Sequence, residues 1–159
     1  DTVREIIDAV KPKRTFYTLE PMPWIYPYST ETYVELIKAI DRPQFGVHFD
    51  PVNMITSPWL YYHNGDFIRD FIRKLGPYIK SCHANDIVLD NKLTVQLREA
   101  RPGLGQLDFT AYLLALAALR AQVPLIIEHL DKAEDYEKAA EYIREVAANC
   151  GVRIIEAGW

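Results

Sequence analysis

The sequence predicts an α/β fold in which four parallel strands are each followed by a helix. Short runs rich in β-branched and aromatic residues alternate with longer segments whose apolar residues recur at helical spacing. Strands that alternate with helices in this way are typical of a parallel sheet covered by helices. No low-complexity segment or shift in composition divides the chain, so we expect a single domain over residues 1–159.

The expected elements follow one another in a regular order. Strands are predicted at residues 14–20, 45–50, 78–83 and 123–128, and helices at residues 2–10, 30–40, 66–75, 108–120 and 134–148. Ser29 and Asp108 can cap two of these helices, and Gly76-Pro77 and Gly151 can end two others. Residues 84–107 are expected to form a long loop. Residues 152–159 are too short to assign, and an edge strand and a docked tail both remain open.

Composition limits the class of protein. Hydrophobic residues make up 49% of the 159 residues and charged residues 25%, enough apolar material for a sizeable core. No apolar run reaches the roughly 18–20 residues of a membrane span, so no membrane association is expected. The net charge of −4 comes without a basic stripe, which argues against a nucleic-acid partner. Cys82 and Cys150, without a spacing motif, predict reduced thiols and a cytoplasmic protein.

Each predicted strand ends on a side chain that can bind a metal ion. These side chains are Glu20, Asp50, His83 and Glu128, in chain order. The carboxyl ends of parallel strands meet at one edge of the sheet, where α/β folds build their sites. Capped or salt-bridged strand ends are the alternative interpretation. Three carboxylates and one imidazole favour Mn²⁺, with Mg²⁺, Co²⁺ and Zn²⁺ as further candidates.

Alternation along the strands adds to this hypothesis. In the second strand, Gly46, His48 and Asp50 share one face, while the apolar side chains share the other. His48 is therefore a candidate for substrate contact, and a hydrogen-bonded interior histidine is the alternative. His129 has the opposite parity to Glu128, so we expect it outside the ligand set unless the strand bulges there.

These residues resemble the sugar phosphate isomerase/epimerase family, which has the xylose isomerase-like TIM-barrel fold. That group includes ketose 3-epimerases, hydroxypyruvate isomerase, inosose dehydratase and, more distantly, endonuclease IV. The order Glu, Asp, His, Glu matches its metal ligands at the ends of the fifth to eighth strands. The His-Ala-Asn-Asp segment at 83–86 and the Arg-Pro-Gly-Leu-Gly run from Arg101 also resemble family segments. The resemblance spans roughly residues 14–149 and implies the C-terminal half of a (β/α)8 TIM barrel.

The resemblance implies a divalent-metal-dependent isomerase or epimerase that acts on a sugar or sugar phosphate. Glu20 and Glu128 would then form the acid/base pair of an enediolate mechanism. A carboxylate cannot remove a proton next to a carbonyl unaided, but a cation that stabilises the developing charge makes the step feasible. A metal-dependent dehydratase of a polyol or keto-sugar, and a non-catalytic sugar-binding fragment, are the alternatives. A nuclease is disfavoured, because Asn53 stands where one of its histidine ligands is expected.

Four further residues are predicted around the metal ligands. Asn53 departs from the histidine of the ketose epimerases, but it can hydrogen-bond a substrate oxygen. Arg101 is a candidate for holding a substrate oxygen or phosphate, with a solvated loop arginine as the alternative. Trp24 stands in an aromatic-rich loop that could pack on a sugar or on a neighbouring part of a barrel. Asp86 is expected to orient either His83 or the following loop.

The length of the chain bears on its partners. A (β/α)8 barrel typically takes about 250 residues, and this chain supplies four strand–helix units. The chain also begins on Asp1 within an amphipathic pattern, so we interpret it as a piece of a longer sequence. A half-barrel alone would expose two parallel sheet edges, which natural proteins avoid. We therefore expect an N-terminal barrel half, or a second copy of this chain, to cover them.

Overall fold

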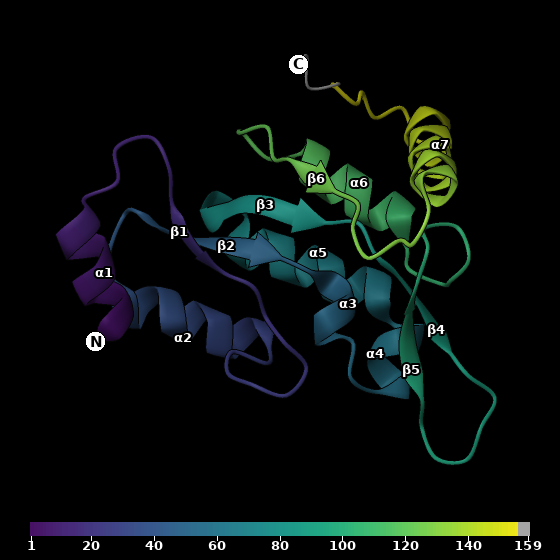
Figure 1. Ribbon diagram of the computed structural model, residues 1–159, viewed down its shortest axis with the longest axis horizontal. Helices are drawn as coiled ribbons and strands as arrows, with labels where there is room; N and C mark the ends of the chain where they lie inside the picture. Colours follow the sequence, from purple (N-terminus) through teal and green to yellow (C-terminus); the bar gives the residue numbers. More distant parts are fainter. Residues whose placement is uncertain (156–159) are drawn as a thin grey trace.

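The centre of the molecule is a four-stranded parallel sheet, seen in the computed structural model, which describes residues 1–155 (Figure 1). Its strand order is β1-β2-β3-β6, and every neighbouring pair is parallel. The strands are β1 (Tyr17–Leu19), β2 (Phe45–Phe49), β3 (Ile79–His83) and β6 (Leu125–Ile126). Because each strand pairs with the previous unit of the chain, the sheet is a partial TIM barrel, as expected. All four strands are shorter than predicted.

One helix precedes β1, and a longer helix follows each strand of the parallel sheet, near the predicted places. The five longer ones are α1 (Thr2–Val10), α2 (Thr30–Ile40), α5 (Asn64–Leu75), α6 (Phe109–Ala117) and α7 (Ala133–Asn149). Ser29 and Asp108 accept backbone N–H groups as N-caps of α2 and α6. Three short elements were not predicted, namely α3 (Pro51–Met54), α4 (Pro58–Tyr62) and the 3₁₀ turn η1 (Gly76–Tyr78). Helix α6 ends at Ala117 rather than at residue 120, and residues 152–155 form no regular element.

The prediction of a loop over residues 84–107 was wrong. This segment contains the strands β4 (Asp86–Leu89) and β5 (Leu97–Ala100), which pair antiparallel as a separate two-stranded sheet. The hairpin extends from the parallel sheet at the end away from α1 (Figure 1). The connecting residues 90–96 are mostly polar, which made the whole segment look like a loop. The strands pair only with each other, so no wider sheet pattern marks them in the sequence.

The core lies between the sheet and the helices on its outer side. In β2, Val47 and Phe49 are fully buried, and the Phe49 ring stacks on Phe71 of α5 with centroids 4.0 Å apart. This is the apolar face that alternation along the second strand predicted. Gly46 and His48 lie on the opposite face of the strand, the face on which alternation also places Asp50. The same alternation therefore separates the packed side of the sheet from the side that carries the polar groups.

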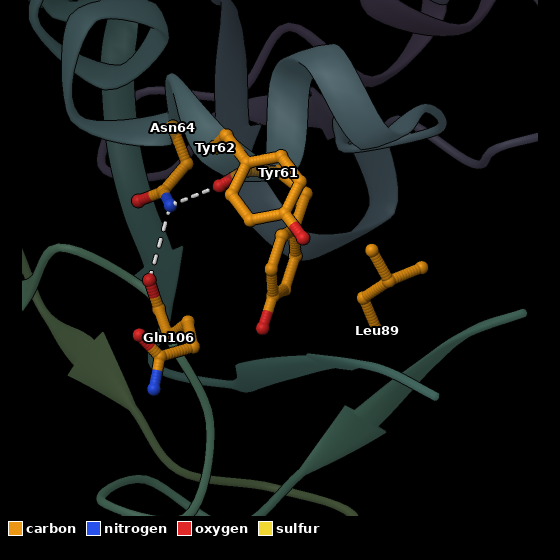
Figure 2. Close-up of a pocket in the computed structure, with 5 residues that line it drawn as sticks. All are labelled: Tyr61, Tyr62, Asn64, Leu89 and Gln106. Carbon is orange, nitrogen blue, oxygen red and sulfur yellow. Dashed lines mark hydrogen bonds between the residues drawn. The ribbon is translucent and has the colours of Figure 1, made fainter. Parts of the chain in front are cut away.

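The segment that follows the hairpin is tied to α5 by one buried amide. Asn64 Nδ2 donates to the carbonyls of Tyr61 and Gln106, at 2.6 and 3.0 Å (Figure 2). Its Oδ1 accepts from the backbone N–H of Asp108 at 2.7 Å. The cavity in Figure 2 is bordered by these groups and by Leu89 of the hairpin. Both ends of the Asn64 amide are thus engaged in holding the fold together at the edge of this cavity.

Both outer strands of the parallel sheet have a single neighbour within residues 1–155. Strand β1 pairs only with β2, and β6 only with β3. Ile126 of β6 is 43% exposed, and Phe16, just before β1, is 45% exposed. Backbone groups and apolar side chains at both edges are thus open to a partner. Among the same residues, no helix is long and apolar enough to cross a membrane.

Candidate metal centre

The structure brings the four predicted ligands into one cluster. One donor atom each from Glu20, Asp50, His83 and Glu128 lies within 4.8 Å of the other three. Glu20 and Asp50 directly follow β1 and β2, and His83 is the last residue of β3. Glu128 lies two residues beyond β6, because this strand ends at Ile126 and not at residue 128 as predicted. Four separate strand ends therefore supply the cluster.

His83 stands at the centre of the cluster. Its Nδ1 lies 2.7 Å from Glu128 Oε1, 3.1 Å from Glu20 Oε1 and 3.4 Å from Asp50 Oδ2. A single ring nitrogen can hydrogen-bond to one acceptor well, and cannot satisfy three carboxylates together. The three carboxylate oxygens therefore lie closer together around this nitrogen than its hydrogen bonding can explain.

Asp50 is held rigidly by the start of α3. Its side chain is 1% exposed, and its Oδ1 accepts the backbone N–H groups of Val52 and Asn53 at 2.8 and 3.3 Å. Pro51 at the first helical position favours this turn, because its fixed φ suits a helix start. The N-cap thus uses one carboxylate oxygen and leaves Oδ2 directed at the cluster.

Two asparagine amides orient the carboxylates. Asn53 Nδ2 donates to Glu20 Oε1 at 3.1 Å and to Asp50 Oδ2 at 3.2 Å. Asn85 Nδ2 donates to Asp50 Oδ2 at 3.1 Å and to Glu128 Oε1 at 3.2 Å. Sequence reasoning missed Asn85, although it stands two residues after His83, a spacing that could have indicated the same side of the chain. Both amides are neutral, so they position the carboxylates without cancelling their charge.

The cluster has an excess of negative charge. Within residues 1–155 its carboxylates form ion pairs only with histidines, and none with a lysine or arginine. Burial raises the pKa of Glu20 above its ordinary value. Burial lowers the pKa of His83, but the hydrogen bond to Asp50 and the charges of Glu128 and Glu20 outweigh it and raise the pKa overall. Buried like charges are costly unless a cation balances them, so this donor set fits a divalent metal ion.

His48 contributes an unpartnered nitrogen next to the cluster. Its Nδ1 hydrogen-bonds with Ser81 Oγ, and its ring centroid lies 4.0 Å from that of His83. Its Nε2 is buried and has no hydrogen-bond partner. A buried polar atom left unpaired costs about 1–3 kcal/mol, and such atoms need a reason. The bond to Ser81 fits a hydrogen-bonded interior histidine, and the unpaired Nε2 is free for substrate contact, so the two roles open from the sequence both stay predictions.

Arg101 and Trp24 lie apart from the contacts of the cluster. Arg101 Nε is 3.6 Å from Asp135 Oδ1 of α7, and its Nη1 donates to the carbonyl of Pro102. Trp24 is 77% exposed in the loop after Glu20. Neither contacts a carboxylate of the cluster through any interaction found in the described residues. Their predicted roles in substrate binding stay predictions.

Asp86 organises the loop that leads into α6. Its buried carboxylate accepts four backbone N–H groups, from Ile87, Gly103, Gly105 and Leu107. Gly105 has to be glycine, because a Cβ there would lie 2.3 Å from Asp86 Oδ1 and 2.4 Å from the Ile87 carbonyl. The sequence left two roles open for Asp86, orienting the His83 ring or orienting the following loop. Its hydrogen bonds go to backbone N–H groups of the hairpin and the following loop, and not to the His83 ring.

Comparison with known proteins identifies the family of this chain. The model of the xylose isomerase-like TIM barrel matches residues 1–146, so the chain belongs to this family. No curated protein sequence matches the chain.

Solved structures with the same fold support the assignment of the fold. A xylose isomerase domain protein from Planctomyces limnophilus shares 24% identity with a TM-score of 0.71, over 94% of this chain and 51% of its own. A xylose isomerase-like TIM-barrel protein from Mycobacterium smegmatis, in complex with magnesium, shares 19% identity with a TM-score of 0.67. The match covers 93% of this chain and 49% of that protein. D-psicose 3-epimerase from Clostridium cellulolyticum H10, with D-tagatose, shares 16% identity with a TM-score of 0.68. The match covers 96% of this chain and 55% of that protein.

A probable 3-DHS dehydratase from Bacillus anthracis has the same fold. It shares 13% identity with a TM-score of 0.67, over 92% of this chain and 54% of its own. The chain thus spans about half the length of the structures that it resembles.

Replacing Asp86 with asparagine should loosen the loop between the hairpin and α6. The amide keeps one acceptor oxygen, so two of the four backbone N–H groups lose their partner, at about 1–3 kcal/mol for each group left buried and unpaired. Hydrogen exchange should accelerate at the amides of Gly103, Gly105 or Leu107, with lower unfolding free energy. Asp90→Asn, in the same hairpin, should leave these amides unchanged. Unaltered exchange in Asp86→Asn would show that the carboxylate does not hold the loop.

Proposed function

We propose that this chain carries the metal- and proton-transfer site of a divalent-metal-dependent isomerase or epimerase acting on sugars. The main support is the convergence of Glu20, Asp50, His83 and Glu128 from four strand ends on one point. These four residues would hold the ion, and Mn²⁺ is the proposed metal, with Mg²⁺, Co²⁺ and Zn²⁺ as alternatives. The bound ion would supply Lewis-acid stabilisation of the negative charge that develops when a C–H bond next to a carbonyl is broken.

Glu20 and Glu128 are the proposed acid/base pair. They reach the His83 ring nitrogen from the two outer strands of the sheet, β1 and β6, so a substrate bound over the cluster would meet one carboxylate from each of these strands. One carboxylate removes the proton next to the carbonyl, and the other delivers a proton to the opposite face, which inverts the centre. Burial raises the pKa of Glu20, which suits a group that must both accept and release a proton.

Asn53 and His48 are proposed to contact the substrate. The Asn53 amide already orients Glu20 and Asp50, and it cannot transfer protons, so its role is positioning. His48 Nε2 is the unpartnered nitrogen beside the cluster and can hydrogen-bond a substrate oxygen. The proposal of Arg101 as a third substrate contact would require it to leave Asp135.

Binding of Mn²⁺, measured by titration calorimetry, tests the metal centre. We expect one site per chain, and Glu20→Gln and Glu128→Gln should each weaken binding by about tenfold or more, about 1.4 kcal/mol. Each substitution keeps the side-chain shape and removes one ligand charge. Glu141→Gln, on the exposed side of α7, removes the same charge elsewhere and should leave the affinity unchanged. Equal binding by all four proteins would contradict the proposed ligands.

Deuterium incorporation from solvent tests proton transfer. With Mn²⁺ present, a panel of keto-sugars should take up deuterium at the carbon next to the carbonyl, and Glu20→Gln and Glu128→Gln should each abolish the uptake. NMR detects the exchange directly. Loss of water from the substrate would instead favour a metal-dependent dehydratase, for which the similarity to the Bacillus anthracis structure is the supporting observation. Binding without either reaction would leave a non-catalytic sugar-binding fragment.

A covering partner for both sheet edges is the third part of the proposal. Strands β1 and β6 each lack a second neighbour in the described chain, and open parallel edges are avoided in nature. We propose that an N-terminal barrel half or a second copy of this chain pairs with them. Light scattering should give twice the chain mass of 18.4 kDa if a second copy does so. A well-folded monomer of the 159 residues alone would contradict both forms of the proposal.

The two cysteines support a reducing compartment, and we propose the cytoplasm. Cys82 is buried in β3, where burial raises the pKa of its thiol to about 12, and neither it nor Cys150 forms a disulfide. A thiol with so high a pKa is unreactive and is suited to packing.

A further inference from the structure

A cavity of about 330 Å³ lies next to the carboxylate cluster, between the hairpin and the start of α3. Asn53 belongs to both places. It lines the cavity, and its side-chain amide donates to Glu20 and Asp50 of the cluster. On the other side the hairpin contributes Ile87, Leu97 and Glu99. The cavity therefore adjoins the proposed site through Asn53 and is large enough for part of a small ligand.

The register of the hairpin shows which side chains face this cavity. Glu99 is directly opposite Ile87, and Leu97 is opposite Leu89, so these residues share one face of the two-stranded sheet. Arg98 also borders the cavity, but it is opposite Val88 and so belongs to the other face. Its Nε donates to Asp90 Oδ1 at 3.1 Å. The charged hairpin side chain on the cavity face is thus the carboxylate of Glu99.

One oxygen of Glu99 is fixed and the other is available. Oε2 hydrogen-bonds with His129 Nδ1 at 3.1 Å, and the same nitrogen lies 3.6 Å from Glu128 Oε1 of the cluster. His129 reaches both groups because its backbone turns to φ 56°, which breaks the strand alternation that had placed it away from Glu128. Within residues 1–155, Glu99 Oε1 has no hydrogen-bond partner, and the side chain is 33% exposed.

We infer that this cavity receives the tail of the substrate beyond its carbonyl end, and that Glu99 selects an unphosphorylated polyhydroxy tail. This inference rests on the proposed function. A carboxylate oxygen accepts a hydrogen bond from a hydroxyl group and repels a phosphate dianion. Of the basic groups on or after the hairpin, Arg98 pairs with Asp90, Arg101 lies 3.6 Å from Asp135, and His129 hydrogen-bonds with Oε2 of Glu99. Glu99 is therefore a specificity-determining residue that works by excluding the charged competitor.

Calorimetric binding of two matched sugars tests this inference on the full chain with Mn²⁺ added. We expect D-fructose to bind at least about tenfold more tightly than D-fructose 6-phosphate. Glu99→Gln, which removes the charge and keeps the shape, should bring the two affinities within about threefold, and Glu99→Lys should reverse the preference. Glu137→Gln and Glu137→Lys, on exposed α7, change the net charge equally and should leave the ratio unaltered.

Three results would overturn the inference. These are tighter binding of the phosphorylated sugar to the unaltered chain, a ratio that does not respond at Glu99, and the absence of binding by either sugar. Deuterium exchange into dihydroxyacetone separates this test from the proposed function, because a three-carbon substrate has no tail to enter the cavity. If dihydroxyacetone takes up deuterium but the preference for the unphosphorylated sugar does not depend on Glu99, only the inference about the tail is overturned. If the Glu99-dependent preference is found but dihydroxyacetone takes up no deuterium, the proposed reaction is overturned and the inferred binding site is retained.

Discussion

Mutual repulsion among the three carboxylates around His83 is the constraint on which the rest of the structure depends. Glu20, Asp50 and Glu128 all lie within 3.4 Å of one ring nitrogen, and they form ion pairs only with histidines in the described chain. A folded chain tolerates such a group when rigid neighbours hold it and a cation balances it. The N-cap of α3 and the amides of Asn53 and Asn85 provide the rigidity. A divalent metal ion is the natural source of the charge.

The fold supplies this cluster because parallel strands end at the same edge. Neighbouring strands contribute one ligand each, and the packed face of the sheet, with Phe49 stacked on Phe71, keeps their spacing fixed. The same geometry leaves β1 and β6 open at the outside, so the cluster and the unpaired edges arise from one topology.

The hairpin β4–β5 connects the cluster to a separate determinant of specificity. Asp86 begins the hairpin and fixes the loop before α6, while Glu99 near its end faces the cavity beside Asn53. His129 links Glu99 back to Glu128. Segments that follow barrel strands can change the wall of a site without altering the strand ends that carry the chemistry, which is how one barrel fold accommodates many substrates.

The sequence by itself determined the α/β class, the order of the main strands and helices, and the four residues that meet. Periodicity, Ser29 and Asp108 as caps, and acidic or imidazole strand ends are local signals, and each can be read without knowing its distant partners. Only the tertiary structure decided the rest. The contacts of the Asn85 amide and the surroundings of the unpartnered His48 nitrogen depend on residues far apart in the chain, while the hairpin and the turned backbone of His129 depart from the expected loop and strand alternation. Such contacts leave no periodic pattern, because packing and not local propensity fixes them.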